Sequence, residues 1–320
     1  MKISLKHPLV ALGVVGLFIV ATVMVLYFSN PRPPVGSDIL EPYLEVTDAL
    51  NRTIRLKAPP QRVVSLAPSI TETLAYLGVL DRVVGVDSYS LASDYLGLNE
   101  TLEARNVVDV GGYWYQYISV EKILELSPDV VLADAGAHAP LKDTFEFYNI
   151  TSIFLHGGSS KSINEVAEDM RLLAKIFDLN SSMVEEFLAE AEERYSSARS
   201  RLGLEGKRVL IVLYSADLVW VAGRDTFISN LFEKLGAVNV IDKEGWVSLS
   251  LEQVLRANPE LVLATADSGF DKTIDQQGLS GLRVVVLSQE ASNALQRPGP
   301  RILDVPDLLY KDLVESGAVG

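Results

Sequence analysis

The chain has 320 residues, of which 28 are Lys or Arg, 42 are Asp or Glu and none is Cys, and its formal net charge is −14. Without thiols there is no disulfide framework, thiolate zinc site, Cys nucleophile or protein-held iron–sulfur cluster, and the acidic balance argues against nucleic acid as a partner, because that binding needs cations to neutralise phosphates. Hydrophobic residues make up 48% of the chain, which predicts a large buried core.

The first predicted element is a membrane-spanning helix over residues 8–28. This stretch carries no charge, and its 21 residues are enough to cross a bilayer as a helix. Two lysines precede it, so the positive-inside rule leaves the N-terminus in the cytoplasm and the chain after Asn30 outside. A cleaved signal peptide is the alternative, although the apolar run is longer than the usual signal core and ends in bulky residues. Both interpretations place the remaining chain outside the cytoplasm.

The patterns divide the chain into five segments. We predict a signal anchor over 1–30, a proline-rich linker over 31–43, an N-terminal α/β lobe over 44–160, connecting helices over 161–204 and a C-terminal α/β lobe over 205–320. Prolines in the linker favour an extended spacer that holds the lobes away from the membrane. Because there is no Cys to carry a lipid, the apolar helix is the anchor that the sequence offers.

Each lobe is predicted to open with a buried strand, over 62–66 and 208–212, followed by a helix that ends at Leu77-Gly78 or Leu235-Gly236. The spacing Ser69-x-x-Glu72 predicts a capping box at the start of the first of these helices. Alternating strands and helices predict two Rossmann-like lobes with mainly parallel sheets, in which ligands bind outside the carboxyl ends of the strands.

An internal repeat supports this two-lobed α/β architecture. Residues 118–133 align without a gap on residues 249–264, an offset of 131. Each copy contains a Ser N-cap (Ser119 or Ser250), a short amphipathic helix, a proline and a buried strand. Two copies so far apart predict two similar lobes and not a solenoid, whose repeats follow at 20–50 residues.

A long helix is predicted between the lobes, over Ser182–Leu202. Its apolar residues recur at spacings of three and four, and Ser182-x-x-Glu185 predicts a capping box at its start. About 20 helical residues span roughly 30 Å. One rigid helix of that length would permit only small changes in the angle between the lobes.

Aromatic residues collect at the predicted ends of strands in both lobes. Any one of them could fill a core or a lid, but the set together indicates a cleft with flat apolar walls for a large ligand. The candidates are Tyr89, Trp114, Tyr115, Tyr214, Trp220 and Trp246.

Catalytic and metal-binding patterns are sparse. The sequence lacks the motifs G-x-S-x-G, H-E-x-x-H, G-x-x-x-x-G-K-[ST] and G-x-G-x-x-G, so we expect no enzyme activity. His138 and His156 follow strands of the first lobe, but the second lobe has no His to complete a metal site across a cleft. We therefore expect no metal bound directly by the protein, and assign His138 a polar contact with the ligand.

Glu121 and Glu252 occupy equivalent places in the repeat, at the start of a helix. Each stabilises the helix N-terminus through its charge, by about 0.3–1 kcal/mol. Two carboxylates placed equivalently on two lobes also make a bipartite surface for a two-fold basic partner.

Four features together resemble the solute-binding proteins of ABC transporters for vitamin B12, ferric siderophores and haem. They are the segments RVVSLAPSITE at 62–72, LSPDVVL at 126–132 and RPGPR at 297–301, and the paired Glu121 and Glu252. The resemblance spans roughly residues 44–313. It implies two lobes bridged by one helix, and docking of the two Glu on Arg residues of an ABC permease dimer that works with its ATPase.

The resemblance also implies a ligand and its contacts. The ligand would be a metal chelate, such as a corrinoid, a ferric siderophore or haem, with no intrinsic cofactor in the protein. Cleft aromatics of the family correspond to Tyr115 or the adjacent Trp114, and to Trp246, while Arg297 or Arg224 would take the place of a basic cleft residue.

The sequence therefore predicts a single-pass, membrane-anchored protein with its lobes outside the cytoplasm, which captures a bulky metal complex and delivers it to a permease. A membrane-anchored ligand sensor with the same binding fold is the alternative. An exported enzyme is a third interpretation, and it lacks a catalytic constellation.

Overall fold

The computed structural model describes residues 43–92, 96–277 and 281–318. These described residues belong to one compact unit. The predicted membrane helix over 8–28 and nearly all of the linker lie outside the described residues, and none of the helices within those residues is long and apolar enough to span a bilayer. The predicted lobe boundaries at 160 and 204 stay predictions.

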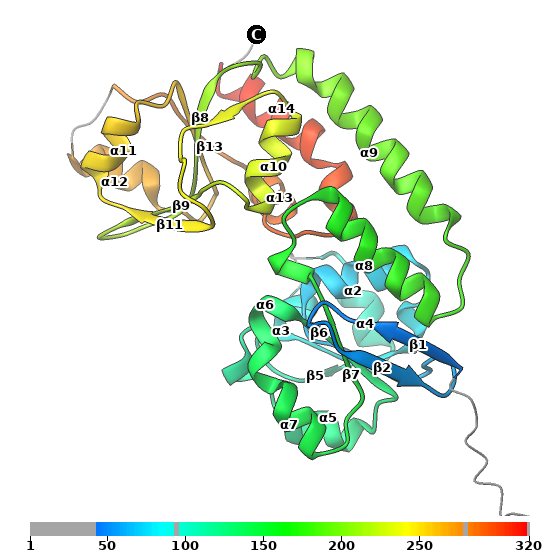
Figure 1. The fold of residues 1–320 in the computed structure, drawn as a ribbon. Helices are drawn as coiled ribbons and strands as arrows, with labels where there is room; N and C mark the ends of the chain where they lie inside the picture. The colour runs from blue at the N-terminus through cyan, green and yellow to red at the C-terminus, as the bar shows by residue number, and fades with distance from the viewer. Residues whose placement is uncertain (1–42, 93–95, 278–280, 319–320) are drawn as a thin grey trace, which may run out of the picture. The chain divides into compact units, whose positions relative to one another are not determined.

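A five-stranded parallel sheet forms the first α/β layer, in the order β5-β4-β3-β6-β7 (Figure 1). Successive residues of a strand face opposite sides, so Val63 enters one hydrophobic core and Val64 enters another. Apolar residues on both faces explain why helices cover both sides. The strands are β3 (Val63–Ser65), β4 (Val83–Val86), β5 (Val108–Asp109), β6 (Val130–Asp134) and β7 (Ser152–Leu155). The helices are α2 (Pro68–Tyr76), α3 (Ser88–Leu91), α4 (Asn99–Ala104), α5 (Val120–Leu126), α6 (Ala135–His138) and α7 (Lys142–Phe147).

The second sheet is mixed. Its parallel part runs β10-β8-β12-β13, and β9 and β11 extend it by antiparallel pairing from β8. Val209 and Leu210 again enter opposite cores. The strands are β8 (Arg208–Ser215), β9 (Val219–Ala222), β10 (Val238–Asn239), β11 (Trp246–Leu249), β12 (Leu261–Ala264) and β13 (Val284–Val286). The helices are α10 (Phe227–Lys234), α11 (Leu251–Ala257), α12 (Phe270–Gln277), α13 (Gln289–Leu295) and α14 (Val305–Glu315).

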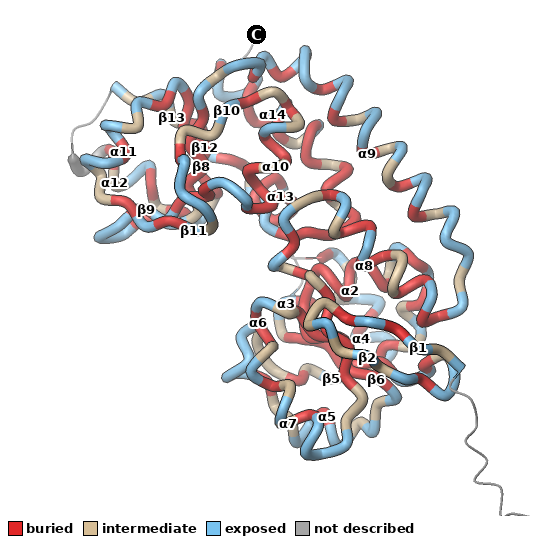
Figure 2. Tube along the Cα trace, viewed as in Figure 1, coloured by how far each residue is buried: buried red, intermediate tan, exposed pale blue. Residues whose placement is uncertain are grey.

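Helices α8 (Ile163–Ile176) and α9 (Ser182–Arg201) connect the two sheets, and a hairpin of β1 (Leu44–Thr47) and β2 (Thr53–Leu56) precedes the first. The predicted long helix is confirmed, with 20 residues in α9. One face of α9, which includes Phe187 and Tyr195, is buried in the hydrophobic core that also contains residues of α10 and α14. Buried and exposed residues therefore alternate along this helix (Figure 2). The capping box predicted at its start is wrong, because Ser181 is the N-cap and its side chain caps no backbone N–H.

The repeat is confirmed in structure as well as in sequence. Ser119 and Ser250 cap α5 and α11 by accepting a hydrogen bond from the third residue of each helix. Both helices end on a residue in the left-handed conformation, Ser127 with φ 46° and Asn258 with φ 48°. A buried strand follows each, β6 and β12.

The capping box predicted from Ser69-x-x-Glu72 is wrong. Helix α2 begins at Pro68, with Ala67 as N-cap and no side-chain cap, and Pro at this position is already set for a helix by its fixed φ. The Glu72 side chain is buried and accepts a hydrogen bond from the backbone N–H of Arg301, far along the chain.

Candidate ligand-binding site

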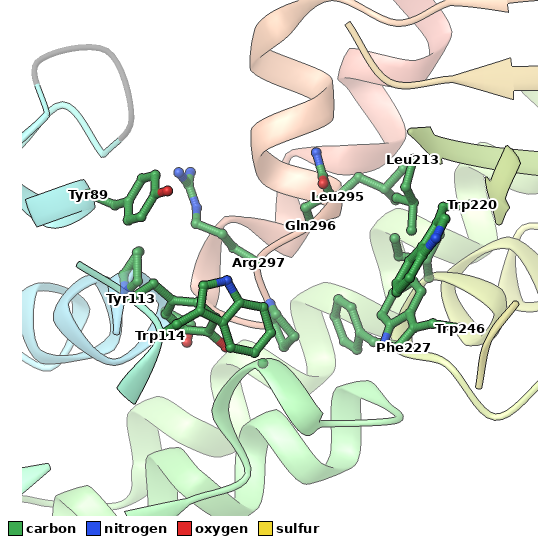
Figure 3. A pocket seen from close by; sticks show the side chains of 15 residues that line it. Tyr89, Tyr113, Trp114, Leu213, Trp220, Phe227, Trp246, Leu295, Gln296 and Arg297 are labelled. Carbon is green, nitrogen blue, oxygen red and sulfur yellow. The ribbon is translucent and has the colours of Figure 1, made fainter. Parts of the chain in front are cut away.

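A cavity of about 360 Å³ is lined by residues that come before α8 and by residues that come after α9. That volume is within the range of small-molecule sites. All three tryptophans of the chain, Trp114, Trp220 and Trp246, line it. Figure 3 shows their rings and those of Tyr89, Tyr113 and Phe227 around the same space. The predicted gathering of aromatic residues therefore occurs, although not every candidate takes part.

One wall is an antiparallel strand pair. Trp220 on β9 and Trp246 on β11 are each 48% exposed, whereas the neighbouring Val221 and Val247 point into a core. The alternation of a strand puts both tryptophans on the outer face. Both residues belong to strands that the sequence did not predict, because β9 and β11 pair with each other and extend the sheet. The pairing of β8 with β9 shifts register between Val212 and Tyr214. Leu213, the residue at this shift, lines the cavity.

The opposite wall is held by a buried carboxylate at the end of β6. Asp134 accepts hydrogen bonds from the backbone N–H groups of Gly136 and Gly158 and from the hydroxyl of Tyr113. A Cβ on Gly158 would stand only 2.5 Å from that hydroxyl, so glycine is needed for this close approach. The Tyr113 ring lies edge-on to the ring of Trp114. Asp134 therefore holds Tyr113 through its hydroxyl group, and Tyr113 in turn packs against Trp114.

The prediction that His138 contacts the ligand is wrong. Its side chain is fully buried and is not among the residues that line the cavity. Nδ1 accepts a hydrogen bond from the backbone N–H of Asp134, so Nε2 carries the proton and donates to the carbonyl of Tyr113. Burial lowers the pKa of His138 and keeps the ring neutral. The histidine therefore positions the backbone of Tyr113, whose ring lines the cavity together with Trp114.

Two other candidates lie outside the cavity lining. Tyr115 begins a 3₁₀ turn and is exposed, and the adjacent Trp114 lines the cavity in its place. Tyr214 is exposed and is paired with Trp220 across the β8–β9 ladder, without reaching the lining. Two residues of the lining, Tyr113 and Phe227, are not among the candidates chosen from the sequence. Tyr113 stands in the same aromatic run as Trp114, whereas Phe227 gives no signal that separates it from an ordinary core residue.

Tyr89 reaches the cavity from the short helix α3, which Asp87 caps. The Asp87 carboxylate accepts hydrogen bonds from the backbone N–H groups of Tyr89 and Ser90 and from the Ser90 hydroxyl. Burial raises the pKa of Asp87 to about 6, and those hydrogen bonds oppose the rise.

This pKa predicts a stability effect that depends on pH. Folded Asp87 holds its proton more tightly than the unfolded chain does, so its contribution to stability is full below about pH 4 and is lost as the pH rises through about 6. Asp87→Asn lacks this loss. We expect its stability relative to the wild type to rise by roughly 2 kcal/mol between pH 4 and pH 7, given about 1.4 kcal/mol per pKa unit over the full titration. Urea unfolding at four pH values measures the difference, and a difference independent of pH would contradict the assignment.

The third side of the cavity is formed by the segment after α13, with Leu295, Gln296 and Arg297 (Figure 3). Arg297 is 2% exposed, and its Nε lies 3.2 Å from Glu72 Oε2 in a buried ion pair. Glu72 comes from α2 and Arg297 from the other end of the chain. Burial raises the pKa of Glu72, and the charge of Arg297 opposes the rise. Arg224, the alternative basic residue, is exposed, faces Glu244 and is not in the lining.

Glu121 and Glu252 are exposed in the first turns of α5 and α11. Their surroundings differ: Glu252 forms an ion pair of 2.7 Å with Arg256, one turn along its helix, whereas the residue in the corresponding place of α5 is Glu125. Within the described residues there is no group of three or more His, Asp or Glu side chains that could hold a metal ion.

Comparisons with known proteins agree with this architecture. A family model described as periplasmic binding protein matches residues 63–280. An uncharacterized ABC transporter substrate-binding lipoprotein of Bacillus subtilis strain 168 is 25% identical over 307 residues, covering 91% of this chain and 93% of that protein. A vitamin B12-binding protein of Photorhabdus laumondii is 24% identical over 267 residues, covering 82% and 91%. The solved structure of a periplasmic heme-binding protein from Roseiflexus sp. RS-1 has the same fold, with a TM-score of 0.63, 22% identity and coverage of 80% and 98%.

Proposed function

Because the chain belongs to the periplasmic binding protein family, we propose that it captures a bulky, flat metal complex outside the cytoplasm and delivers it to an ABC permease. The ligand class that fits the site comprises corrinoids, ferric siderophores and haem. The protein acts by binding and release, and the proposal assigns it no chemical step. Relatives whose names specify a B12-binding protein and a heme-binding protein support this ligand class.

The observation that carries the proposal is the convergence of all three tryptophans on one cavity. Trp114 precedes Trp220 and Trp246 by more than 100 residues, and the three residues are 54%, 48% and 48% exposed. Exposing a large aromatic ring to water has a cost that a stacked ligand removes. A planar ligand that lies between Trp114 on one wall and Trp246 on the other would cover both.

Tryptophan fluorescence tests the proposal, because every Trp that emits lies at the cavity. We expect quenching by at least one of cyanocobalamin, hemin and a ferric siderophore. Trp246→Ala should weaken that affinity about 30-fold, the effect of losing roughly 2 kcal/mol at an aromatic anchor.

Tyr117→Ala is the matched control for this experiment. It removes an aromatic side chain that is 65% exposed and outside the lining, so its affinity should equal that of the wild type. Absence of quenching by all three ligands, or equal losses in the two variants, would refute the cleft.

Delivery requires a docking surface, and we assign it to Glu121 and Glu252. Both carboxylates are exposed, and the repeat places them in equivalent positions on two equivalent helices. A pair of this kind matches a basic, two-fold partner such as a permease dimer that works with its ATPase.

The apolar stretch over 8–28 supports a location at the cell membrane, with residues 44–320 outside the cytoplasm. We propose that this stretch is an uncleaved single-pass anchor. The sequence has no Cys that could carry a lipid in its place.

A further inference from the structure

We propose that Glu72 is a specificity-determining residue: by neutralising Arg297, it makes the cavity select flat ligands that present no negative charge to its third side. This inference rests on the proposed function and narrows its ligand class. It favours a chelate whose buried edge bears neutral groups, such as carboxamides, over one whose buried edge bears carboxylates or phenolates.

The charge balance of the lining supports this selection. Among the described residues that line the cavity, Arg297 alone carries a formal charge, and the others are aromatic, aliphatic, hydroxyl or amide residues and glycine. An unopposed arginine at such a place would attract an anionic group. Here the carboxylate of Glu72 stands 3.2 Å from the Arg297 Nε, and both side chains are almost fully buried, at 9% and 3% exposure.

Because Glu72 and Arg297 are both buried, their ion pair disfavours a second anion at Arg297. Water screens little of the interaction between two buried charges, so a ligand carboxylate at Arg297 would also meet the repulsion of Glu72. Glu72 is not free to move away, because its Oε1 accepts a hydrogen bond of 2.7 Å from the backbone N–H of Arg301. Breaking the pair to admit an anion would leave a buried carboxylate uncompensated. A neutral edge of the ligand avoids both costs.

Two pairs of ligands test the inference, each with one member that bears carboxylate and one in which that group is a neutral ester or amide. They are hemin with its dimethyl ester, and cyanocobalamin with its monocarboxylic acid, made by hydrolysis of one amide. Whichever pair quenches tryptophan emission is titrated against the wild type and Glu72→Gln, which keeps the shape of the side chain and an acceptor oxygen. We expect the wild type to bind the uncharged member more tightly. Glu72→Gln should shift the affinity ratio toward the acid by about tenfold or more.

Glu290→Gln is the matched control. It removes one negative charge close by, at an exposed ion pair with Arg301, and water should screen that change, leaving the ratio as in the wild type. A wild type that prefers the acids, or a ratio that Glu72→Gln and Glu290→Gln change equally, would overturn the inference while the proposed function stands. If none of the four binds but an anionic ferric siderophore does, the inference is overturned and the proposed function stands. Failure of all four and of the ferric siderophore would overturn both. Circular dichroism of each variant confirms that it is folded before titration.

Discussion

Reversing both charges, Glu121→Lys with Glu252→Lys, is expected to abolish transport while ligand affinity stays within twofold of the wild type. Each carboxylate that meets an arginine of a permease contributes a charge-assisted hydrogen bond of about 1.5–3 kcal/mol, and each lysine replaces that attraction with repulsion. Neither residue lines the cavity. Uptake of labelled ligand by cells or liposomes that contain the permease and its ATPase measures the first result, and fluorescence titration measures the second.

The matched control is Glu193→Lys with Glu315→Lys, which makes the same change in net charge at exposed positions of α9 and α14. It should transport as the wild type does. The single variants should differ, because Arg256 already neutralises part of the charge of Glu252, so Glu121→Lys should reduce transport more than Glu252→Lys. A doubly reversed protein that still transports would eliminate the docking role.

The fold was largely predictable, because its signals are local. A Ser at the N-cap, apolar residues at helical spacing and a short apolar run after a proline determine each repeat within about 16 residues, and the structure shows the same caps at Ser119 and Ser250. The long helix could also be predicted, because 20 residues of α9 follow one periodic pattern. Such patterns depend on neighbours in the chain and need no knowledge of distant contacts.

The site was predictable only in part, because its details depend on contacts between distant segments. The tryptophans could be grouped by their position in each lobe, but the antiparallel pairing of β9 with β11 that orients Trp220 and Trp246 leaves no pattern in either segment alone. His138 stands after a strand, as a ligand-binding residue would, yet its ring turns inward to the backbone of Asp134 and Tyr113.

Glu72 is the clearest case of a residue whose role depends on contacts with distant parts of the chain. Its spacing from Ser69 matches the capping-box pattern S-x-x-E, so the sequence predicts a local hydrogen bond at the start of the helix. Its partners, Arg297 and Arg301, follow more than 220 residues later. The capping interaction is local and weak, of the order of 1 kcal/mol, whereas a carboxylate buried at this place needs a compensating charge. The tertiary ion pair therefore prevails over the local motif.

That ion pair predicts a large loss of stability on Arg297→Met, which keeps the apolar length of the side chain and removes its charge. Removing one partner of a buried pair leaves the other uncompensated, which costs about 3–5 kcal/mol. Glu72 and Arg297 also join segments from opposite ends of the chain, so the loss should appear in the global transition. Urea unfolding at pH 8 measures it through a lower midpoint at an unchanged slope.

The pH dependence of this loss identifies its cause. Burial already raises the pKa of Glu72, and Arg297 is the largest influence that lowers it, so the pKa rises further in Arg297→Met. A group whose folded pKa is raised contributes stability below its unfolded pKa and loses it as the pH rises through the folded value. The deficit of Arg297→Met should therefore be smaller at pH 5 than at pH 8. Adding Glu72→Gln should recover most of the loss at pH 8, because no buried charge then remains unpaired. A deficit that is equal at both pH values and persists in the double variant would instead assign the loss to packing of the Arg297 side chain.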